Sequence, residues 1–452
     1  MLNKSFSLSV KKQIKSYNKI INVDSDKSIS IRSFLLSSVS HNISHLNNIL
    51  ESEDVLSAIN CLKKLGVKIK KIQSKRYLVY GKGLGSLSAK KNTVLNFGNS
   101  GTLARLLIGL LSTNPEIHVK VKGDHSLNQR NMAKLIDIMN EFGATFKPKK
   151  NTYLPLTLIS SEMPVGINYK AGVSAQLKSA AILAGLNSYG VTNVHEDYCS
   201  RNHTENMLLQ NSKLINVKKN KNGTTNIKIF GKESLKSLNI NVPGDPSSAA
   251  FFTALTLINK NASLVIKNVG LNIRRIGFYN LLKKHGAKIK FKRVKKINND
   301  LIGDIVVKSS KLRPIKAGLH YYPSTTDEYP ILFVIASLIP GLSIFKGLTE
   351  LANKESNRIE EMKKILNQVG IKCKSTKSEM RIRGVKKIKK NNKVIRVPNL
   401  GDHRICMSTV IFSLLTGINS EIKNFETVRT SSPSFLNIIK LLGGKYEIKK
   451  KR

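Results

Sequence analysis

The sequence is poor in several residue types, and each shortage excludes a class of protein. It has no tryptophan and only four cysteines, and no two of these form a C-x-x-C pair. This spacing argues against a disulfide framework and against a zinc site. No apolar window approaches the length of a membrane span, and residues 1–15 lack the apolar core of a signal peptide. We therefore expect a reduced, cytoplasmic protein that does not bind a membrane.

Acidic residues are also scarce, because the chain has 28 of them against 76 basic residues, a formal net charge of +48. Such an excess is typical of proteins that bind nucleic acid or membranes. Here it is mostly lysine spread over predicted strand faces and turns, and the basic segments carry no aromatic stacking stripe. We interpret the charge as a compositional bias on solvated surfaces. A lysine-rich, nucleic-acid-binding repeat protein stays open as an alternative.

Arginine is scarce too, with roughly one for every four lysines. A guanidinium group can grip a carboxylate or phosphate through two parallel hydrogen bonds, which an ammonium group cannot do. About half of the arginines fall in the motifs described below, and we interpret them as anion binders. For Arg105 and Arg274, bracing of the structure is an equally good interpretation. The arginines in the motifs are Arg32, Arg105, Arg130, Arg201, Arg274, Arg358 and Arg404.

What the chain does have is a repeat. Six times, at intervals of 73 to 80 residues, a small or polar cluster opens an apolar helical run. A helix start offers unpaired N–H groups and the positive end of the helix dipole, which suits phosphate or carboxylate. The pattern therefore predicts a strongly anionic substrate. The six positions are Ser28, Gly101, Ser174, Ser247, Asp327 and His403.

A second series of helices alternates with the first. Amphipathic runs at 55–65, 132–142, 278–285, 359–369 and 435–442 each end in glycine, followed in most copies by alternating apolar and lysine residues. This predicts a helix, a left-handed glycine cap and a half-exposed strand. The third copy, near 207–214, lacks the glycine and is degenerate. In the last copy, Ser432 and Pro433 are predicted to supply the N-cap and the first-turn proline. We expect an α/β repeat, with three units in each of two domains and a cleft between them.

These segments together resemble the 5-enolpyruvylshikimate-3-phosphate synthase family. The matching motifs occur in the family's order and cover about residues 20 to 440. They lie at 26–32, 98–105, 126–130, 174–180, 200–205, 243–249, 327–330, 354–358 and 402–404.

The resemblance implies a fold and a set of boundaries. The family has two domains, each an inside-out α/β barrel made of three βαβαββ repeats, and its chain crosses between the domains twice. In this numbering, one domain would comprise 1–24 and 246–452, including the N-terminal strand. The other, the shikimate-3-phosphate-binding domain, would comprise 25–245.

The resemblance also implies a reaction. The enolpyruvyl group of phosphoenolpyruvate moves to the 5-hydroxyl of shikimate 3-phosphate by addition and elimination, and phosphate is released, in the shikimate pathway to aromatic amino acids. The family uses no metal or organic cofactor, and it is the target of the inhibitor glyphosate. We expect a monomer that acts on these two small molecules and does not bind nucleic acid.

The family's functional positions map onto this chain as follows. The acid and base of the two proton transfers match Asp327 and Glu355, with Lys27 shaping the charge nearby; the alternative for Glu355 is a surface helix carboxylate paired with Lys354 or Arg358. Shikimate 3-phosphate would contact Lys27, Ser28, Arg32, Ser174, Ala175, Gln176, Ser200, Arg201, Asp327 and Lys354. Phosphoenolpyruvate would contact Lys27, Gly101, Arg130, Gln176, Arg358 and Arg404.

The chain departs from the family at several positions. Asn202 and Asn357 replace aspartates, which keeps the size and loses the charge. Arg429 precedes a C-terminal turn where the family often has lysine or threonine, and its contact with phosphoenolpyruvate stays undecided. The nearest alternative function is enolpyruvyl transfer onto UDP-N-acetylglucosamine, but that family has a cysteine in the loop corresponding to 123–132 and this chain does not. RNA 3′-phosphate cyclase is a more distant alternative that lacks these motifs.

Overall fold

The computed structural model describes residues 5–211, 213–388 and 393–450. The chain forms two compact units. Unit 1 comprises Met1–Asp24, Gly244–Lys295 and Leu301–Arg452, and unit 2 comprises Ser25–Pro243 and Lys296–Asp300. The first boundary, after Asp24, lies where the resemblance places it. The second, after Pro243, lies two residues earlier than expected, and the segment 296–300 also belongs to unit 2.

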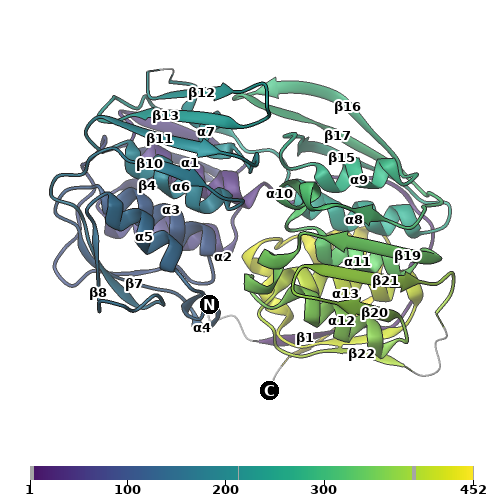
Figure 1. Ribbon diagram of the computed structural model, residues 1–452. Helices are drawn as coiled ribbons and strands as arrows, with labels where there is room; N and C mark the ends of the chain where they lie inside the picture. The colour runs from purple at the N-terminus through teal and green to yellow at the C-terminus, as the bar shows by residue number, and fades with distance from the viewer. Residues whose placement is uncertain (1–4, 212, 389–392, 451–452) are drawn as a thin grey trace. The chain divides into compact units, whose positions relative to one another are not determined.

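Unit 2 contains three copies of a βαβαββ repeat (Figure 1). Its elements are α1 (Lys27–Ser38), β3 (Ile43–Asn47), α2 (Glu53–Lys64), β4 (Lys68–Gln73), β5 (Arg76–Tyr80), β6 (Val94–Asn96), α3 (Gly101–Ser112), β7 (His118–Lys122), α4 (His125–Asn128), α5 (Ala133–Glu141), β8 (Thr145–Lys147), β9 (Leu156–Ile159), β10 (Asn168–Ala171), α6 (Ala175–Gly185), β11 (Val191–Glu196), α7 (His203–Leu208), β12 (Ile215–Lys219), β13 (Thr225–Phe230) and β14 (Asn239–Asn241).

Unit 1 repeats the pattern three more times, with short 3₁₀ helices η1 to η3 added. Its elements are β1 (Phe6–Val10), β2 (Asn18–Ile21), α8 (Pro246–Ile258), β15 (Ser263–Gly270), α9 (Gly277–Lys284), β16 (Lys288–Ile297), β17 (Asp300–Lys308), β18 (Lys316–Ala317), η1 (Leu319–Tyr321), α10 (Tyr322–Thr325), α11 (Tyr329–Ser337), β19 (Gly341–Lys346), η2 (Thr349–Asn353), α12 (Arg358–Gln368), β20 (Lys372–Ser375), β21 (Glu379–Gly384), β22 (Val394–Val397), α13 (His403–Thr416), β23 (Asn419–Ile422), η3 (Phe425–Thr430), α14 (Phe435–Leu441) and β24 (Tyr446–Lys450).

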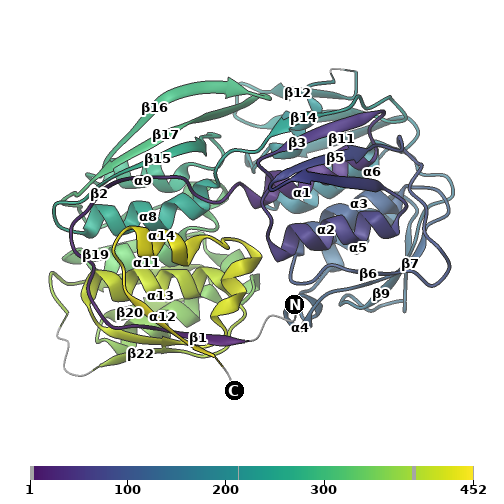
Figure 2. The ribbon, with the colours of Figure 1, turned by 180° about the vertical axis from the view of Figure 1, so that it is seen from behind.

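Each repeat builds one four-stranded sheet, and the predicted α/β repeat fold is confirmed. The sheet order β10-β11-β13-β12 is typical: β10 and β11 are parallel, and the other pairs are antiparallel. Three sheets include a strand from a distant part of the chain. In unit 1, β2 pairs with β15, as Figure 2 shows, and β1 pairs with β23 and β24. In unit 2, β14 pairs with β3.

The first helix of each repeat lies inside its unit and the sheets lie outside (Figure 1). In α8 every residue from Pro246 to Leu257 is buried, because this segment is apolar or small on all sides. Gly109 of α3 shows how closely these helices pack, since an added Cβ there would lie 2.7 Å from the carbonyl oxygen of Ala180 in α6. Each unit has its own hydrophobic core.

The second helices end as the sequence predicts. Left-handed glycines follow α2, α5, α9, α12 and α14, with φ between 81° and 98° at Gly66, Gly143, Gly286, Gly370 and Gly443. The degenerate third copy is the six-residue helix α7, which ends without a glycine. Among the described helices, none is both long and apolar enough to cross a membrane.

Two predicted helix starts are wrong. Asp327 lies in a turn, and α11 begins at Tyr329 because Pro330 fits only the first turn of a helix. The N-cap of α14 is Ser434 and not Ser432. The hydroxyl groups of both serines donate instead to Oδ2 of Asp24, at 2.7 and 2.9 Å.

Candidate functional site

Arg32 of α1 is buried in unit 2 and is held by neutral oxygen atoms. Its Nε donates to Oγ1 of Thr204 at 2.8 Å, and Nη2 donates to Oγ of Ser179 at 3.0 Å. Nη1 donates to the carbonyl oxygen of Ser28, one turn earlier in the helix, at 3.1 Å. These contacts fix the orientation of the guanidinium group, and such a group can bind a carboxylate or phosphate through two parallel hydrogen bonds.

Lys27, the first residue of α1, is paired with a carboxylate that the sequence analysis missed. Its Nζ lies 2.9 Å from Oδ2 of Asp54, whose side chain is only 5% exposed. Asp54 belongs to the first turn of α2, where acidic residues are common because they complement the helix dipole. An acidic residue at this position is expected for the helix alone, so nothing in the sequence indicates that Asp54 contacts Lys27.

The start of α6 carries three predicted ligands in succession. The hydroxyl of Ser174 caps the helix by accepting from the N–H of Leu177, which leaves its proton available to a ligand. Ala175 has no polar side-chain atom and can offer only its backbone N–H. The amide of Gln176 is oriented from both ends: its oxygen accepts from Arg105 at 3.1 Å and its nitrogen donates to Oγ1 of Thr102 at 2.9 Å.

Arg105 behaves as a structural brace. Besides contacting Gln176, its Nη1 donates to the carbonyl oxygen of Gly101 at 3.1 Å. This is the bracing interpretation considered for it in the sequence analysis. Its contribution to the site is therefore to hold α3 against α6.

Gly101 and Arg130 lie close together. A Cβ added at Gly101 would lie 2.9 Å from Nη1 of Arg130 and equally close to Nη1 of Arg105. The Arg130 guanidinium group is held by Nη2, which donates to Oδ1 of Asn99 at 3.1 Å. The absence of a side chain at Gly101 thus leaves room for two guanidinium groups at the start of α3.

Ser200 is anchored to a buried carboxylate. Its backbone N–H and its hydroxyl both donate to Oε1 of Glu196, at 2.7 and 2.5 Å. Arg201 follows in the loop that leads to α7. Glu196 was not among the predicted residues.

In unit 1, Arg358 is surrounded by three carboxylates. Its Nε lies 2.9 Å from Oδ2 of Asp402 and its Nη2 lies 2.5 Å from Oε2 of Glu355. Nη1 lies 3.7 Å from Oδ1 of Asp327, which is an ion pair without a hydrogen bond. The Arg358 side chain is 1% exposed. The structure therefore brings the predicted acid and base, Asp327 and Glu355, to the same guanidinium group.

These carboxylates stabilise the charged form of Arg358. Burial on its own lowers the pKa of the guanidinium group, but Asp402, Glu355 and Asp327 raise it by a larger amount, so the net pKa lies above its ordinary value. Asp402 also accepts from the backbone N–H of Arg404 at the start of α13. The alternative for Glu355 is a surface helix carboxylate paired with Lys354 or Arg358. The surface helix is wrong, because Glu355 lies in a bend before α12 and its side chain is 15% exposed. The pairing with Arg358 does occur.

Arg404 presents buried donors. Among the described residues, its Nε and Nη1 atoms have no hydrogen-bond partner, although the side chain is 5% exposed. Its guanidinium carbon lies 5.9 Å from the centre of the Phe251 ring. Buried guanidinium donors are costly to leave unpaired, so an anionic ligand is the natural partner. Lys354 lies in the segment between η2 and Glu355.

The departures from the family have identifiable roles. Asn357 still caps α12, because its side chain accepts from the N–H of Glu360 at 3.3 Å. Asn202 donates to Asn206, one turn further along. Arg429 of η3 lies with its guanidinium carbon 5.4 Å from the centre of the Phe6 ring, within unit 1.

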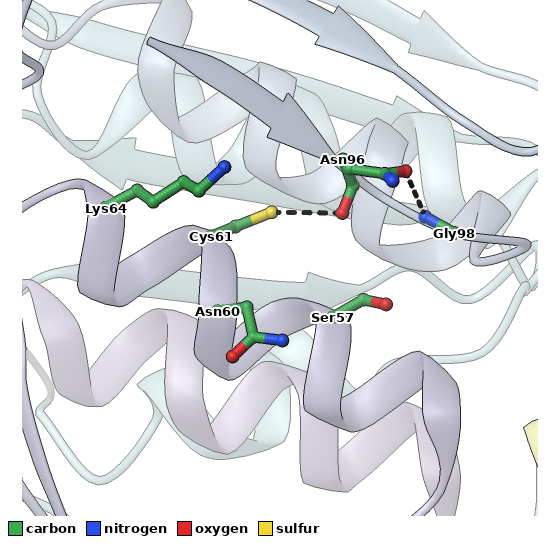
Figure 3. Close-up of a pocket in the computed structure, with 6 residues that line it drawn as sticks. All are labelled: Ser57, Asn60, Cys61, Lys64, Asn96 and Gly98. Carbon is green, nitrogen blue, oxygen red and sulfur yellow. Dashed lines mark hydrogen bonds between the residues drawn. The ribbon is translucent and has the colours of Figure 1, made fainter. Parts of the chain in front are cut away.

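A pocket of about 440 Å³ lies near the turn that precedes α3 (Figure 3). It is lined by Ser57, Asn60, Cys61, Lys64, Asn96 and Gly98, all of them outside the predicted set. Figure 3 shows that the Cys61 side chain of α2 points toward the end of β6, where its thiol donates to the carbonyl oxygen of Asn96 at 3.4 Å. Burial raises the pKa of this thiol to about 12, so it stays neutral and unreactive at neutral pH.

Within the described residues, no cluster of His, Cys, Asp or Glu side chains could hold a metal ion.

Comparison with known proteins gives consistent results. The sequence model of the family described as EPSP synthase (3-phosphoshikimate 1-carboxyvinyltransferase) matches residues 11–439. The 3-phosphoshikimate 1-carboxyvinyltransferase of Petrotoga mobilis is 38% identical over 93% of this chain and 96% of its own length. The enzyme of the same name from Zymomonas mobilis is 36% identical over 95% of this chain and 94% of its own length.

Solved structures agree with this. EPSP synthase from Acinetobacter baumannii superposes with a TM-score of 0.84 at 32% identity, covering 98% of this chain and all of the other. The enolpyruvyl transferase NikO from Streptomyces tendae superposes over the whole of both chains with a TM-score of 0.74. At 12% identity, NikO shows a shared fold alone.

Proposed function

Because this chain belongs to the EPSP synthase (3-phosphoshikimate 1-carboxyvinyltransferase) family, we propose that its two units supply different parts of that family's reaction. The reaction is the transfer of the enolpyruvyl group from phosphoenolpyruvate to the 5-hydroxyl of shikimate 3-phosphate, with release of phosphate. This function is supported over UDP-N-acetylglucosamine enolpyruvyl transfer, and over a nucleic-acid-binding repeat protein, by the family match and the solved structures.

In our proposal, unit 2 binds shikimate 3-phosphate. Its phosphate and hydroxyl groups need cationic donors and small hydroxyl partners, which Arg32, Ser28, Ser174, Ser200 and Arg201 supply. Lys27 lies at the start of α1 and contributes charge close to these groups. The amide of Gln176 and the backbone N–H of Ala175 complete this set, with Lys354 and Asp327 of unit 1 as further contacts.

The groups proposed to bind phosphoenolpyruvate are mainly guanidinium groups. This substrate carries a carboxylate and a phosphate close together, and planar forks bind both well. Arg404, with its buried donors, and Arg358, with its side chain buried, are the contributions of unit 1. Arg130 and the backbone at Gly101 are those of unit 2, with Lys27 and Gln176 beside them.

The single observation that carries the catalytic proposal is the position of Asp327 and Glu355 on one guanidinium group. In the addition step, a proton must reach the methylene carbon of phosphoenolpyruvate while the 5-hydroxyl loses its own. In the elimination step, the new methyl group loses a proton and phosphate leaves. Two carboxylates fixed by the same charged partner can exchange these acid and base roles, because Arg358 compensates whichever of them is ionised.

We also propose that the protein acts as a cytoplasmic monomer. All four cysteines are free, which fits a reducing compartment. Analytical ultracentrifugation should give a single species near the chain mass of 50.2 kDa. A dimer at micromolar concentration would contradict the monomer.

A phosphate-release assay tests the function. With phosphoenolpyruvate present, shikimate 3-phosphate, UDP-N-acetylglucosamine and an oligonucleotide are supplied in separate reactions. We expect phosphate release with shikimate 3-phosphate alone. Release with UDP-N-acetylglucosamine in its place, or no release with any acceptor, would contradict the proposal.

A further inference from the structure

Three charged side chains form a cluster deep inside unit 2, and the reaction proposed above does not use any of them. Lys178 of α6 lies 2.8 Å from Oε1 of Glu196 at the end of β11 and 2.7 Å from Oε1 of Glu205 in α7. The side chains of Lys178 and Glu196 are fully buried, and that of Glu205 is 2% exposed. Breaking such a buried cluster is costly, and replacing it by apolar residues often costs nothing, so its presence suggests a role beyond stability.

The cluster is directly connected to the proposed shikimate 3-phosphate ligands. Oε1 of Glu196, the atom that contacts Lys178, also accepts the backbone N–H and the hydroxyl of Ser200. Charge keeps this acceptor strong: burial alone would raise the pKa of Glu196, but Lys178 and the hydrogen bonds from Ser200 lower it below its ordinary value. Glu196 is therefore an ionised acceptor for both donors of Ser200 at neutral pH.

A second connection runs through the residues that flank the cluster in the sequence. Ser179 follows Lys178 and Thr204 precedes Glu205, and both of their hydroxyls accept from Arg32. The hydroxyl of Thr204 also donates to that of Ser179 at 2.8 Å. The ammonium group of Lys178 thus fixes α6, α7 and β11 at the place where Arg32 and Ser200 are held.

We propose that Glu196 is a positioning residue for shikimate 3-phosphate, acting through Ser200, and that Lys178 holds Glu196 in place. The inference rests on the proposed function, because Ser200 is a ligand only within that proposal. Glu196 itself does not touch the substrate. Its contribution is to fix the backbone and hydroxyl of Ser200, and with them the turn that carries Arg201, before the substrate arrives.

Glu205 provides a matched control. It contacts the same lysine with the same kind of group and is equally buried, but in the described part of the chain it reaches Ser200 only through Lys178. Glu196→Gln and Glu205→Gln are thus the same chemical change beside the same cation. A role in stability alone predicts similar effects for the two variants, whereas a positioning role predicts an effect on substrate binding for Glu196→Gln only.

The experiment measures KM for each substrate, kcat and the unfolding midpoint for both variants. We expect Glu196→Gln to raise KM for shikimate 3-phosphate about tenfold, the scale of a lost charge-assisted hydrogen bond. KM for phosphoenolpyruvate and kcat should stay within about threefold, and Glu205→Gln should change KM for shikimate 3-phosphate by less than about threefold. Equal effects of the two variants, or equal increases in both KM values, would overturn the inference.

A double-mutant cycle with Ser200→Ala keeps the test decisive. If Glu196 acts through Ser200, the tenfold effect of Glu196→Gln should fall to threefold or less when Ser200 is already alanine. Independent, multiplying effects would contradict the inference.

Calorimetric titration of shikimate 3-phosphate into the wild-type protein distinguishes a failure of the proposed function from a failure of the positioning role. Failure of the wild type to bind refutes the proposed function, whereas normal binding with equal effects of the two glutamine variants refutes only the positioning role.

Discussion

Arg32 and Arg130 of unit 2 are held in a different way from Arg358 of unit 1. In unit 2, Arg32 donates to two hydroxyls and a carbonyl group, and Arg130 donates to an amide. In unit 1, Arg358 lies among Asp402, Glu355 and Asp327. Hydroxyl, carbonyl and amide oxygens orient a guanidinium group through hydrogen bonds, whereas carboxylates also compensate its charge.

This difference indicates a division of work. A bound anion such as a phosphate group needs guanidinium donors that are held in a fixed orientation, which the hydrogen bonds of Arg32 supply in unit 2. Proton transfer needs carboxylates that are fixed in position and close to a charge that stabilises them, which is the arrangement around Arg358. In our proposal Arg358 also contacts phosphoenolpyruvate, so it serves both tasks, and the residue type alone does not reveal which tasks an arginine serves.

The largest expected effect is on stability. Arg358→Met leaves three carboxylates without their shared cation, so we expect the free energy of unfolding to fall by about 3–5 kcal/mol. The matched variant Arg32→Met removes hydrogen bonds to Thr204, Ser179 and Ser28 and leaves Thr204 and Ser179 bonded to each other, so it should cost less, about 1–3 kcal/mol. Urea unfolding of both variants measures the difference. Equal losses would break the comparison between the units.

The next effect is on catalysis. Asp327→Asn keeps the size of the side chain and removes its ability to exchange a proton, so kcat should fall at least about 100-fold. KM for both substrates should change by less than about threefold. Steady-state phosphate release measures all three values. A variant with kcat near that of the wild type would show that Asp327 does not transfer a proton.

A smaller effect is expected at Asp54, the partner of Lys27. Asp54→Asn can still accept from the Lys27 ammonium group but loses the charge that orients it, so kcat/KM for phosphoenolpyruvate should fall about tenfold. Glu53→Gln removes an exposed carboxylate from the same helix turn and should change kcat/KM by less than twofold. The idea that Asp54 orients Lys27 fails if the two variants behave alike.

The smallest effect concerns Gly101. The methyl group added in Gly101→Ala would lie 2.9 Å from Nη1 of both Arg105 and Arg130, so both guanidinium groups must shift. We expect KM for phosphoenolpyruvate to rise severalfold, and the Ki of glyphosate, a longer molecule, to rise more. Gly172→Ala is the control, because nothing lies within 4 Å of its added methyl. An unchanged ratio of Ki to KM in Gly101→Ala would place Gly101 outside the inhibitor's binding site.

The fold could be predicted from the sequence more fully than the long-range contacts between side chains and strands. Helix ends at Gly66 or Gly370 are local, since a left-handed residue after an amphipathic run is decided by its neighbours. The pairing of β1 with β24 spans almost the whole chain, and only the resemblance placed the N-terminal strand with the C-terminal half. The wrong N-cap at Ser432 has a similar origin, because Asp24, a residue 408 positions away, takes its hydroxyl.

The site shows the same limit. Motifs pointed to Asp327, Glu355 and Arg358, but the grouping of all three with Asp402 depends on how α12, α13 and the turn before α11 pack in unit 1. Asp54, Glu196 and Lys178 were missed because each looks locally like an ordinary helix or strand residue. Their partners lie in other elements, 18 to 27 positions away in the sequence, so these residues come together only in the folded chain.

The most direct test of the division of work is the dissociation constant of shikimate 3-phosphate, measured by calorimetry for Arg32→Met and Asp327→Asn. We expect Arg32→Met to weaken binding at least about tenfold, because a charged donor is lost from unit 2. Asp327→Asn should bind within about threefold of the wild type. Weaker binding to Asp327→Asn than to Arg32→Met would contradict the account.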